Sequence, residues 1–173
     1  MKKLACALFV FFVGVSICAF AGTEQVINTK NEYGGKTLMS TYSPGDNQYK
    51  NGLEELVTYL DSNGKEMRLE SYYTNDKATK TGITKEIGFV GKKEKMLIKK
   101  ESYYTNEYAK KGLITMMATY YDSNGRMDKR EFYFTDEFTR KEGVAKSTAD
   151  VDSNSNLVNQ KHYDRNGVLL PKK

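Results

Sequence analysis

The sequence contains little of several residue types: among 173 residues it has no tryptophan, two prolines, one histidine and two cysteines. Both cysteines, Cys6 and Cys18, lie in the first 21 residues, so the remainder has no thiol for a disulfide, a nucleophile or a metal ligand. A single histidine, His162, leaves a catalytic triad or a histidine-based metal site without enough members. With prolines only at positions 44 and 171, no Pro-rich linker divides the chain, and residues 22–173 are predicted to form one domain.

The first 21 residues have the pattern of a secretory signal peptide. Lys2 and Lys3 precede an apolar run, Leu4 to Ile17, and Ala19-Phe20-Ala21 supplies small residues for cleavage after Ala21. The apolar run is too short for a comfortable membrane span, so an integral membrane protein is not expected. We therefore expect an exported protein, periplasmic or secreted. A lipoprotein anchored through Cys18 is the alternative, but Ile17 stands where that motif requires a small residue.

The charge of the chain argues against nucleic acid as a partner. Removal of Lys2 and Lys3 lowers the formal net charge from +5 to +3. The basic residues are interspersed with acidic ones, a pattern typical of a solvated surface rather than of a nucleic-acid footprint.

A unit of about 30 residues recurs along the chain. DSNGRMDKREFYFT, which ends at Thr135, has counterparts that end at Ser43, Thr74, Thr105 and Asp164, at spacings of 31, 31, 30 and 29 residues. Glycines repeat in parallel at positions 52, 82, 112 and 143. This period predicts five units, approximately 22–52, 53–82, 83–112, 113–143 and 144–173.

Each unit is predicted to contain two strands joined by a tight turn. DSNG at 61–64 and 122–125, DSNS at 152–155 and Val90-Gly91-Lys92 occupy the turn positions, and Asn-Gly favours a hairpin because both residues tolerate positive φ. A loop such as TNDKATKTG, with Thr first and Gly last, is typical of a capped helical turn between units. The fold class is therefore all-β, an antiparallel meander of about ten strands, either an open sheet or a sheet curled into a barrel.

The second strand of each unit has two different faces, because side chains alternate along a strand. One face carries Tyr73, Ser71 and Leu69 and their counterparts, and is expected to be the core. The other carries Tyr, Glu and a basic residue, and is expected to face solvent. On this second face, the recurring tyrosines Tyr72, Tyr103 and Tyr133 are the candidate binding residues.

The segment TYYDSNGRMDKREFYF resembles the repeats of MORN-type and YwqK-like proteins, in which aromatic strand ends flank an Asn-Gly turn in stacked hairpins. The resemblance implies a repeated hairpin sheet used for binding, with no catalytic residues to transfer. This chain departs from the family in its longer unit and its less Gly-rich turns.

Residues Tyr120 to Met127 also resemble the choline- or glucan-binding repeats of cell-wall proteins. Those repeats need Trp for their aromatic cage, and this chain has none.

Three candidate sites have plainer interpretations. Asp150, Asp152, Asn154 and Asn156 alternate as in a calcium loop, but Ser155 replaces the required Gly and Lys161 the closing Glu. We therefore predict a hairpin turn and no metal site.

The glutamates Glu70, Glu101 and Glu131 could act as glycosidase carboxylates, but each recurs beside a basic residue, as in a charged sheet face. His162 aligns with Tyr72, Tyr103 and Tyr133 and is expected on the strand surface.

These features predict an exported, non-enzymatic repeat protein that needs no cofactor and binds a protein, a peptide or a cell-envelope glycan. The alternative is a small periplasmic carrier whose barrel or half-barrel encloses an apolar ligand. Lys100, Arg130 and Asp128 on the presumed inner face argue against the carrier.

Overall fold

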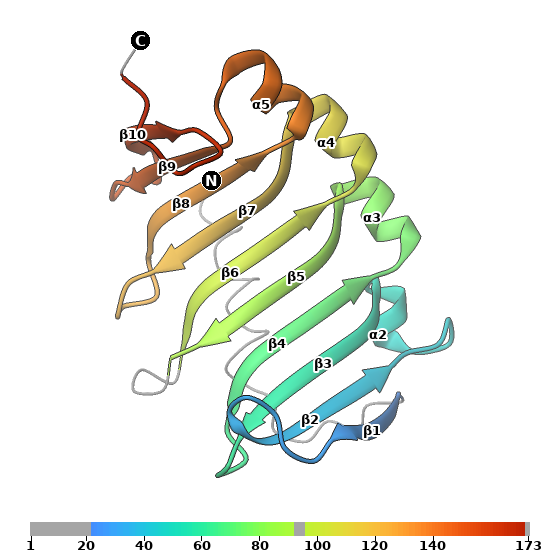
Figure 1. The fold of residues 1–173 in the computed structure, drawn as a ribbon. Coiled ribbons are helices and arrows are strands. Elements are labelled where there is room, and N and C mark those ends of the chain that lie inside the picture. Colours follow the sequence, from blue (N-terminus) through green and yellow to red (C-terminus); the bar gives the residue numbers. More distant parts are fainter. Residues whose placement is uncertain (1–21, 92–95, 172–173) are drawn as a thin grey trace.

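The computed structural model describes residues 22–91 and 96–171. They form one antiparallel sheet of ten strands in sequential order, with four short helices at one end of the strands (Figure 1). In chain order the elements are β1 Thr23–Asn28, β2 Gly34–Thr41, α2 Asn47–Lys50, β3 Leu53–Asp61, β4 Glu66–Tyr73, α3 Asn75–Thr81, β5 Ile83–Val90, β6 Leu97–Tyr104, α4 Asn106–Gly112, β7 Ile114–Tyr121, β8 Met127–Phe134, α5 Asp136–Glu142, β9 Lys146–Val151 and β10 Leu157–Tyr163.

The predicted all-β meander is confirmed, and the sheet is open. Every strand pairs with its sequence neighbours, and β1 and β10 lie at opposite ends of the sheet (Figure 1). The alternative of a closed barrel is wrong, because among the described strands β1 pairs with β2 and β10 with β9, and β1 does not pair with β10.

Tight turns of one geometry join strands in the described part of the chain. At Asp61, Oδ1 accepts hydrogen bonds from the backbone N–H of Asn63 and of Lys65, at 2.8 and 2.9 Å. The same bonds form at Asp122, at Asp152 and at a further turn that begins at Asp164. The Asp side chain therefore fixes each turn by satisfying two backbone donors. The turn expected at Val90-Gly91-Lys92 includes Lys92, which lies outside the described residues. The signal peptide and Cys18 also lie outside them.

The helices α3, α4 and α5 begin at Thr74, Thr105 and Thr135, whose hydroxyl groups accept from the backbone N–H three residues on. Each of these threonines also donates its own N–H to the residue that ends the preceding connection, Gly52, Gly82 or Leu113. This bond attaches successive units along the helix end of the sheet.

The expectation that a glycine follows each helical turn fails after α4. Gly82 and Gly143 occupy the left-handed positions that follow α3 and α5, but Gly112 is the last residue of α4, and Leu113, with φ 62°, takes the left-handed position. Strand β7 accordingly begins at Ile114 instead of Leu113.

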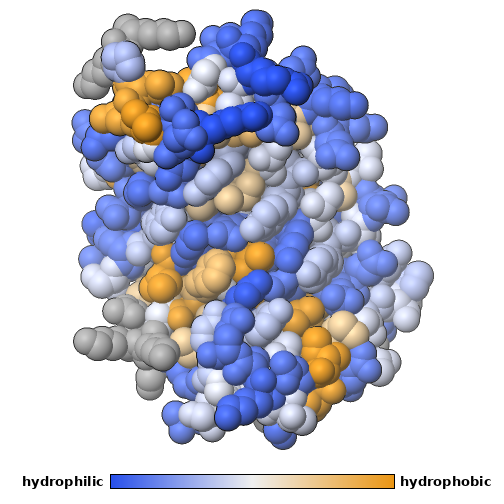
Figure 2. Space-filling view, in the orientation of Figure 1, coloured by the Kyte–Doolittle hydropathy of each residue, from blue (hydrophilic) through white to orange (hydrophobic). Residues whose placement is uncertain are grey.

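The sheet has no single continuous apolar face. Its buried apolar residues are spread along the strands and helices: Tyr42, Val57, Met67, Ala78, Ile87, Ala109, Ala118 and Ala149. The face seen in Figure 2 is mostly hydrophilic, with hydrophobic residues in separate patches. Stability must therefore depend strongly on polar and aromatic contacts between strands.

Candidate functional site

The face that carries Glu70, Glu101 and Glu131, called the Glu face below, was expected to be open to solvent. Instead, Glu70 is 3% and Glu131 6% exposed, and Glu101 is half-buried. The expectation was wrong because long basic and aromatic side chains on the same strand and on the neighbouring strands cover these carboxylates.

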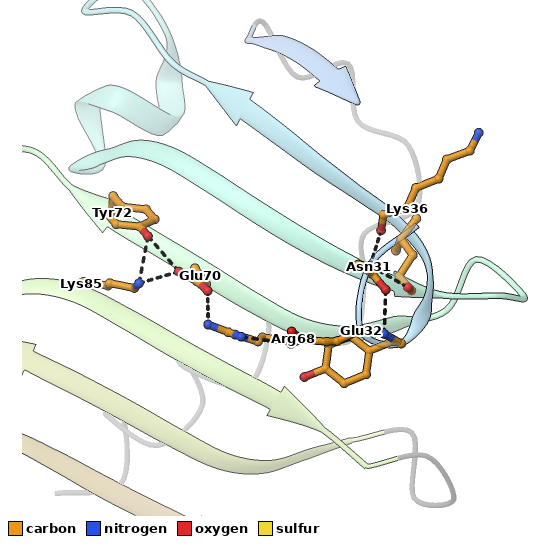
Figure 3. A network of polar contacts seen from close by, with 9 residues as sticks. Asn31, Glu32, Lys36, Arg68, Glu70, Tyr72 and Lys85 are labelled. Carbon is orange, nitrogen blue, oxygen red and sulfur yellow. Dashed lines mark hydrogen bonds and ion pairs between the residues drawn. The ribbon is translucent and has the colours of Figure 1, made fainter. Parts of the chain in front are cut away.

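Glu70 shows how each carboxylate is held (Figure 3). Arg68, two residues earlier on β4, forms an ion pair with its Oε1. Lys85 on β5 reaches Oε2 at 2.5 Å, and the hydroxyl of Tyr72 donates to the same oxygen at 2.8 Å. Arg68 also contacts Glu32, in the turn before β2, at 3.2 Å. Both oxygens of the buried carboxylate are thus satisfied, as burial of a charge requires.

The arrangement recurs on the next two even-numbered strands. Glu101 is paired with Lys99 at 2.6 Å and accepts from Tyr103 at 2.7 Å. Glu131 is paired with Lys129 at 2.8 Å and accepts from Tyr133 at 2.9 Å. Strands β4, β6 and β8 therefore share one pattern, a basic residue, then Glu, then Tyr.

The odd-numbered strands add rings between these cations. In the register of the sheet, Tyr59 lies opposite Arg68, Phe89 is paired with both Arg68 and Lys99, and Tyr120 with both Lys99 and Lys129. The cationic groups lie 4.7–5.8 Å from the ring centroids. This ladder of alternating cations and rings crosses six strands, and each cation–π contact is worth about 0.5–1 kcal/mol at a partly exposed site.

These contacts shift the ionisation of the Glu face. Burial by itself raises the pKa of each glutamate, but the cations and the tyrosine hydroxyl groups outweigh it, so the pKa of Glu70, of Glu101 and of Glu131 is lowered below 4.5. Burial and the bond to Glu101 raise the pKa of Tyr103 to about 12. The glutamates are therefore fixed anions, unsuited to act as general acids near neutral pH.

The candidate binding residues Tyr72, Tyr103 and Tyr133 lie on this face and in one row. Each donates its hydroxyl to the glutamate two residues earlier on its own strand. Lys85 lies 4.6 Å from the ring centroid of Tyr72, and Lys146 lies 5.8 Å from that of Tyr133. Because the hydroxyl groups, and in two cases a ring face, already have partners within the sheet, the contacts favour a structural role for these tyrosines.

His162 does not belong to this row. It is paired with Ser147, on the opposite face, and its Nδ1 lies 2.6 Å from Oγ of Ser147. The residue in the tyrosine row is Tyr163, paired with Lys146. The error comes from counting back from Asp164 as the counterpart of Thr135. Asp164 follows Tyr163 directly, whereas Phe134 separates Tyr133 from Thr135, so the count is one residue off and places His162 on the wrong face.

Ser147 is fully buried, so its contact with His162 does not offer an accessible nucleophile. The segment Asp150 to Asn156 forms the predicted hairpin turn, and Asp152 uses its carboxylate on the backbone of that turn. In residues 22–91 and 96–171, no group of three or more His, Cys, Asp or Glu side chains is placed to hold a metal ion.

A depression with a lining of mixed polarity lies at the helix end of β2, β3 and β4. Thr41, Tyr42, Glu54, Glu55 and Tyr72 line it. It is wide open to solvent and contains no convergent set of basic or nucleophilic groups, so it offers little for a small ligand.

The edges of the sheet were not singled out from the sequence, yet most of the large exposed apolar residues lie there. On the N-terminal side, Val26 and Ile27 of β1 are 51% and 49% exposed. On the C-terminal side, the exposed residues are Leu157, Val158, Val168 and Leu169. The signal was present in TEQVIN, a short β-type segment with no proline or lysine to discourage pairing.

Comparisons with protein-family models and with curated proteins gave no match. In the part of the chain that the structure describes, no helix has the length and apolar character needed to span a membrane.

Proposed function

We propose that this chain is an exported, non-enzymatic repeat protein that binds a protein partner at the β1 edge of its sheet. An extended segment of the partner pairs with β1 as an additional strand. The observation that carries the proposal is the contrast between the saturated Glu face and the open edge. On the Glu face, carboxylates, cations and phenols are paired with one another. Among the described strands, β1 pairs only with β2, and all six of its residues are exposed.

An exposed strand edge selects one kind of partner. Its outward N–H and C=O groups are spaced to match another extended polypeptide, and side chains at alternate positions add specificity. A glycan has no such repeat of amide groups. Of the partners that the sequence allowed, the edge therefore favours a protein or peptide segment.

The carrier alternative receives less support. A closed barrel is incompatible with the open strand order, and a half-barrel would require a continuous apolar face. On the face opposite the Glu face, Glu86 accepts from Tyr73 and Ser102 and is paired with Lys100 at 2.9 Å. Such charges suit a polar surface better than an apolar ligand site.

The proposal is tested by capture from the native envelope or medium, with the full chain expressed and recovered after export. The expected result is a protein captured by the wild type and by Val158→Lys, which alters the other edge, but not by Val26→Lys. Hydrogen exchange should show protection of the β1 amides on binding. Equal capture by Val26→Lys, with β1 unprotected, would refute the edge as the site.

In the same preparation, an N-terminus other than Gly22 or an acyl group on Cys18 would overturn the proposed processing.

A further inference from the structure

One cation in the middle of the sheet has no carboxylate partner. The other basic residues of β4 to β9 each form an ion pair with a glutamate: Arg68, Lys85, Lys99, Lys100, Lys129 and Lys146. Arg130 of β8 forms no ion pair with any described residue, although Asp128 lies two residues earlier on the same strand. The protein's own side chains therefore leave the charge of Arg130 unbalanced.

The guanidinium of Arg130 also lacks good hydrogen-bond acceptors. Its Nη2 contacts Sδ of Met127 at 3.2 Å, and a thioether is a weak acceptor. Its Nε is buried and has no partner among the described residues. Nε of Arg68 is also unpartnered, but both terminal nitrogens of Arg68 contact carboxylates. Because a buried donor without an acceptor is unfavourable, Arg130 is the cation that gains most from an external acceptor.

The preceding unit shows which partner is missing. On the face opposite the Glu face, Lys100 of β6 is paired with Glu86 of β5 at 2.9 Å. One unit later, Arg130 occupies the position of Lys100, and Met117 of β7 occupies the position of Glu86. In each hairpin the cation stands two residues before the residue that lies opposite this position. This unit therefore keeps the cation and replaces its carboxylate with a thioether side chain.

The surroundings of Arg130 leave room beside the guanidinium and supply a phenol. Arg130 is paired with Thr119 on one side and Ala149 on the other, and both have short side chains. Tyr121, two residues after Thr119 on β7, is half-buried, and its hydroxyl has no hydrogen bond to another described residue. Burial raises the pKa of Tyr121, and the charges of Lys100 and Arg130 act in the opposite direction, so both cations lie near this phenol.

We propose that Arg130 and Tyr121 form a binding site for a carboxylate that comes from outside the chain. A guanidinium binds a carboxylate through two parallel N–H donors, and the phenol donates to one of its oxygens. Glu86 is held in the same way, between the cation of Lys100 and the hydroxyl of Tyr73. The external carboxylate therefore completes at β8 an arrangement that the preceding unit completes with its own glutamate.

A small organic acid and a polypeptide both carry this group, the latter in acidic side chains and at its C-terminus. The site lies on β7 and β8, away from β1 in the strand order, so the inference does not depend on the proposed function.

The test is a titration of the exported protein with acetate, at constant ionic strength, followed by NMR of the arginine Nε–H signals. The Arg130 signal should shift along a saturable curve, because its Nε or the neighbouring Nη gains an acceptor. The Arg68 signal is the internal control and should not shift, because its guanidinium already holds two carboxylates. No shift of the Arg130 signal at about 0.1 M acetate would overturn the site.

A variant that restores the missing partner tests the assignment directly. Met117→Glu should place a carboxylate beside Arg130 and weaken acetate binding by about tenfold or more, whereas the uncharged Met117→Gln should bind like the wild type. Arg130→Gln should remove saturable binding in calorimetry, and Arg140→Gln, on α5, should not. The Arg130→Gln result decides the matter if Met117→Glu does not fold. Undiminished binding to Arg130→Gln, or to a folded Met117→Glu, would refute the site.

Three further probes identify the ligand class. N-acetylalanine that binds about tenfold more tightly than acetate indicates a polypeptide carboxylate, and equal binding indicates a small acid. N-acetylalaninamide should not bind, because it has no carboxylate. Binding of this amide, or tighter binding of inorganic phosphate than of acetate, would overturn the assignment to a carboxylate.

Discussion

The hydroxyl of Tyr73 on β4 donates a 2.6 Å hydrogen bond to Oε2 of Glu86 on β5, across the face opposite the Glu face. Lys100 and Ser102 hold the other oxygen of Glu86, at 2.9 and 2.8 Å. Burial, together with this carboxylate, raises the pKa of Tyr73 well above 10. Both faces of the sheet therefore hold partly or fully buried carboxylates between a cation and a phenol. The first two predictions concern the loss of this carboxylate charge, by substitution and by acid.

Glu70→Gln should lower the free energy of unfolding by about 2–4 kcal/mol, because it leaves Arg68 and Lys85 beside a neutral amide. Glu66→Gln is the matched control: Glu66 lies on the same strand but is exposed, and a change of less than about 0.5 kcal/mol is expected. Urea unfolding measures both. Equal effects of the two substitutions would show that the ion-pair ladder contributes little.

Acid should destabilise the fold. The pKa of Glu70, of Glu86, of Glu101 and of Glu131 is lower in the folded protein than the ordinary value of 4.5. Their contribution is therefore complete above the unfolded pKa and is lost as the pH falls through the folded pKa. The urea midpoint should be flat from about pH 7 to about pH 5.5 and then fall steeply toward about pH 3. Glu131→Gln should start lower and show a shallower fall, and a parallel fall would contradict this assignment.

Leu113→Gly should stabilise the protein by about 0.5–1 kcal/mol, because Leu113 occupies the left-handed conformation at φ 62°, which costs a side-chain-bearing residue about 1–2 kcal/mol. The reverse change at the corresponding position, Gly82→Leu, should be strongly destabilising. There φ is 76°, and an added Cβ would lie 2.3 Å from Cδ2 of Tyr108. Melting temperatures measure both, and destabilisation by Leu113→Gly would mean that packing of the leucine side chain outweighs the backbone strain.

Deletion of residues 83–113 should give a folded protein with lower stability. It removes β5, α4 and β6 and joins Gly82 to Ile114, so that a left-handed glycine again precedes a strand. Because each strand pairs only with its neighbours, the remaining strands can keep their pairing. Deletion of 83–112 is the control, since it leaves Leu113 as an extra residue after Gly82 and should be less stable. Circular dichroism should show a β-type spectrum and one cooperative melt for the first deletion, and its aggregation would count against the modular sheet.

The sequence by itself determined the order and type of most elements. Asp-Ser-Asn-Gly sets the turns, because its Asp side chain bonds to the local backbone, and Thr74 caps its helix through its own hydroxyl. These interactions join residues a few positions apart. They need nothing from the rest of the fold, and so they can be inferred from a short stretch of chain.

Only the tertiary structure decided which side of the sheet buries charge, where the register shifts and whether the edges meet. The alternation along β4 separates Glu70 from Ser71 but does not say which is covered, since the cover of Glu70 comes partly from Lys85 on the next strand. His162 and Tyr163 lie on opposite faces of the sheet, and the pairing of β10 with β9 decides that Tyr163, opposite Lys146, continues the tyrosine row. Closure depends on the tilt and stagger of all ten strands together, and no single unit of the sequence carries that information.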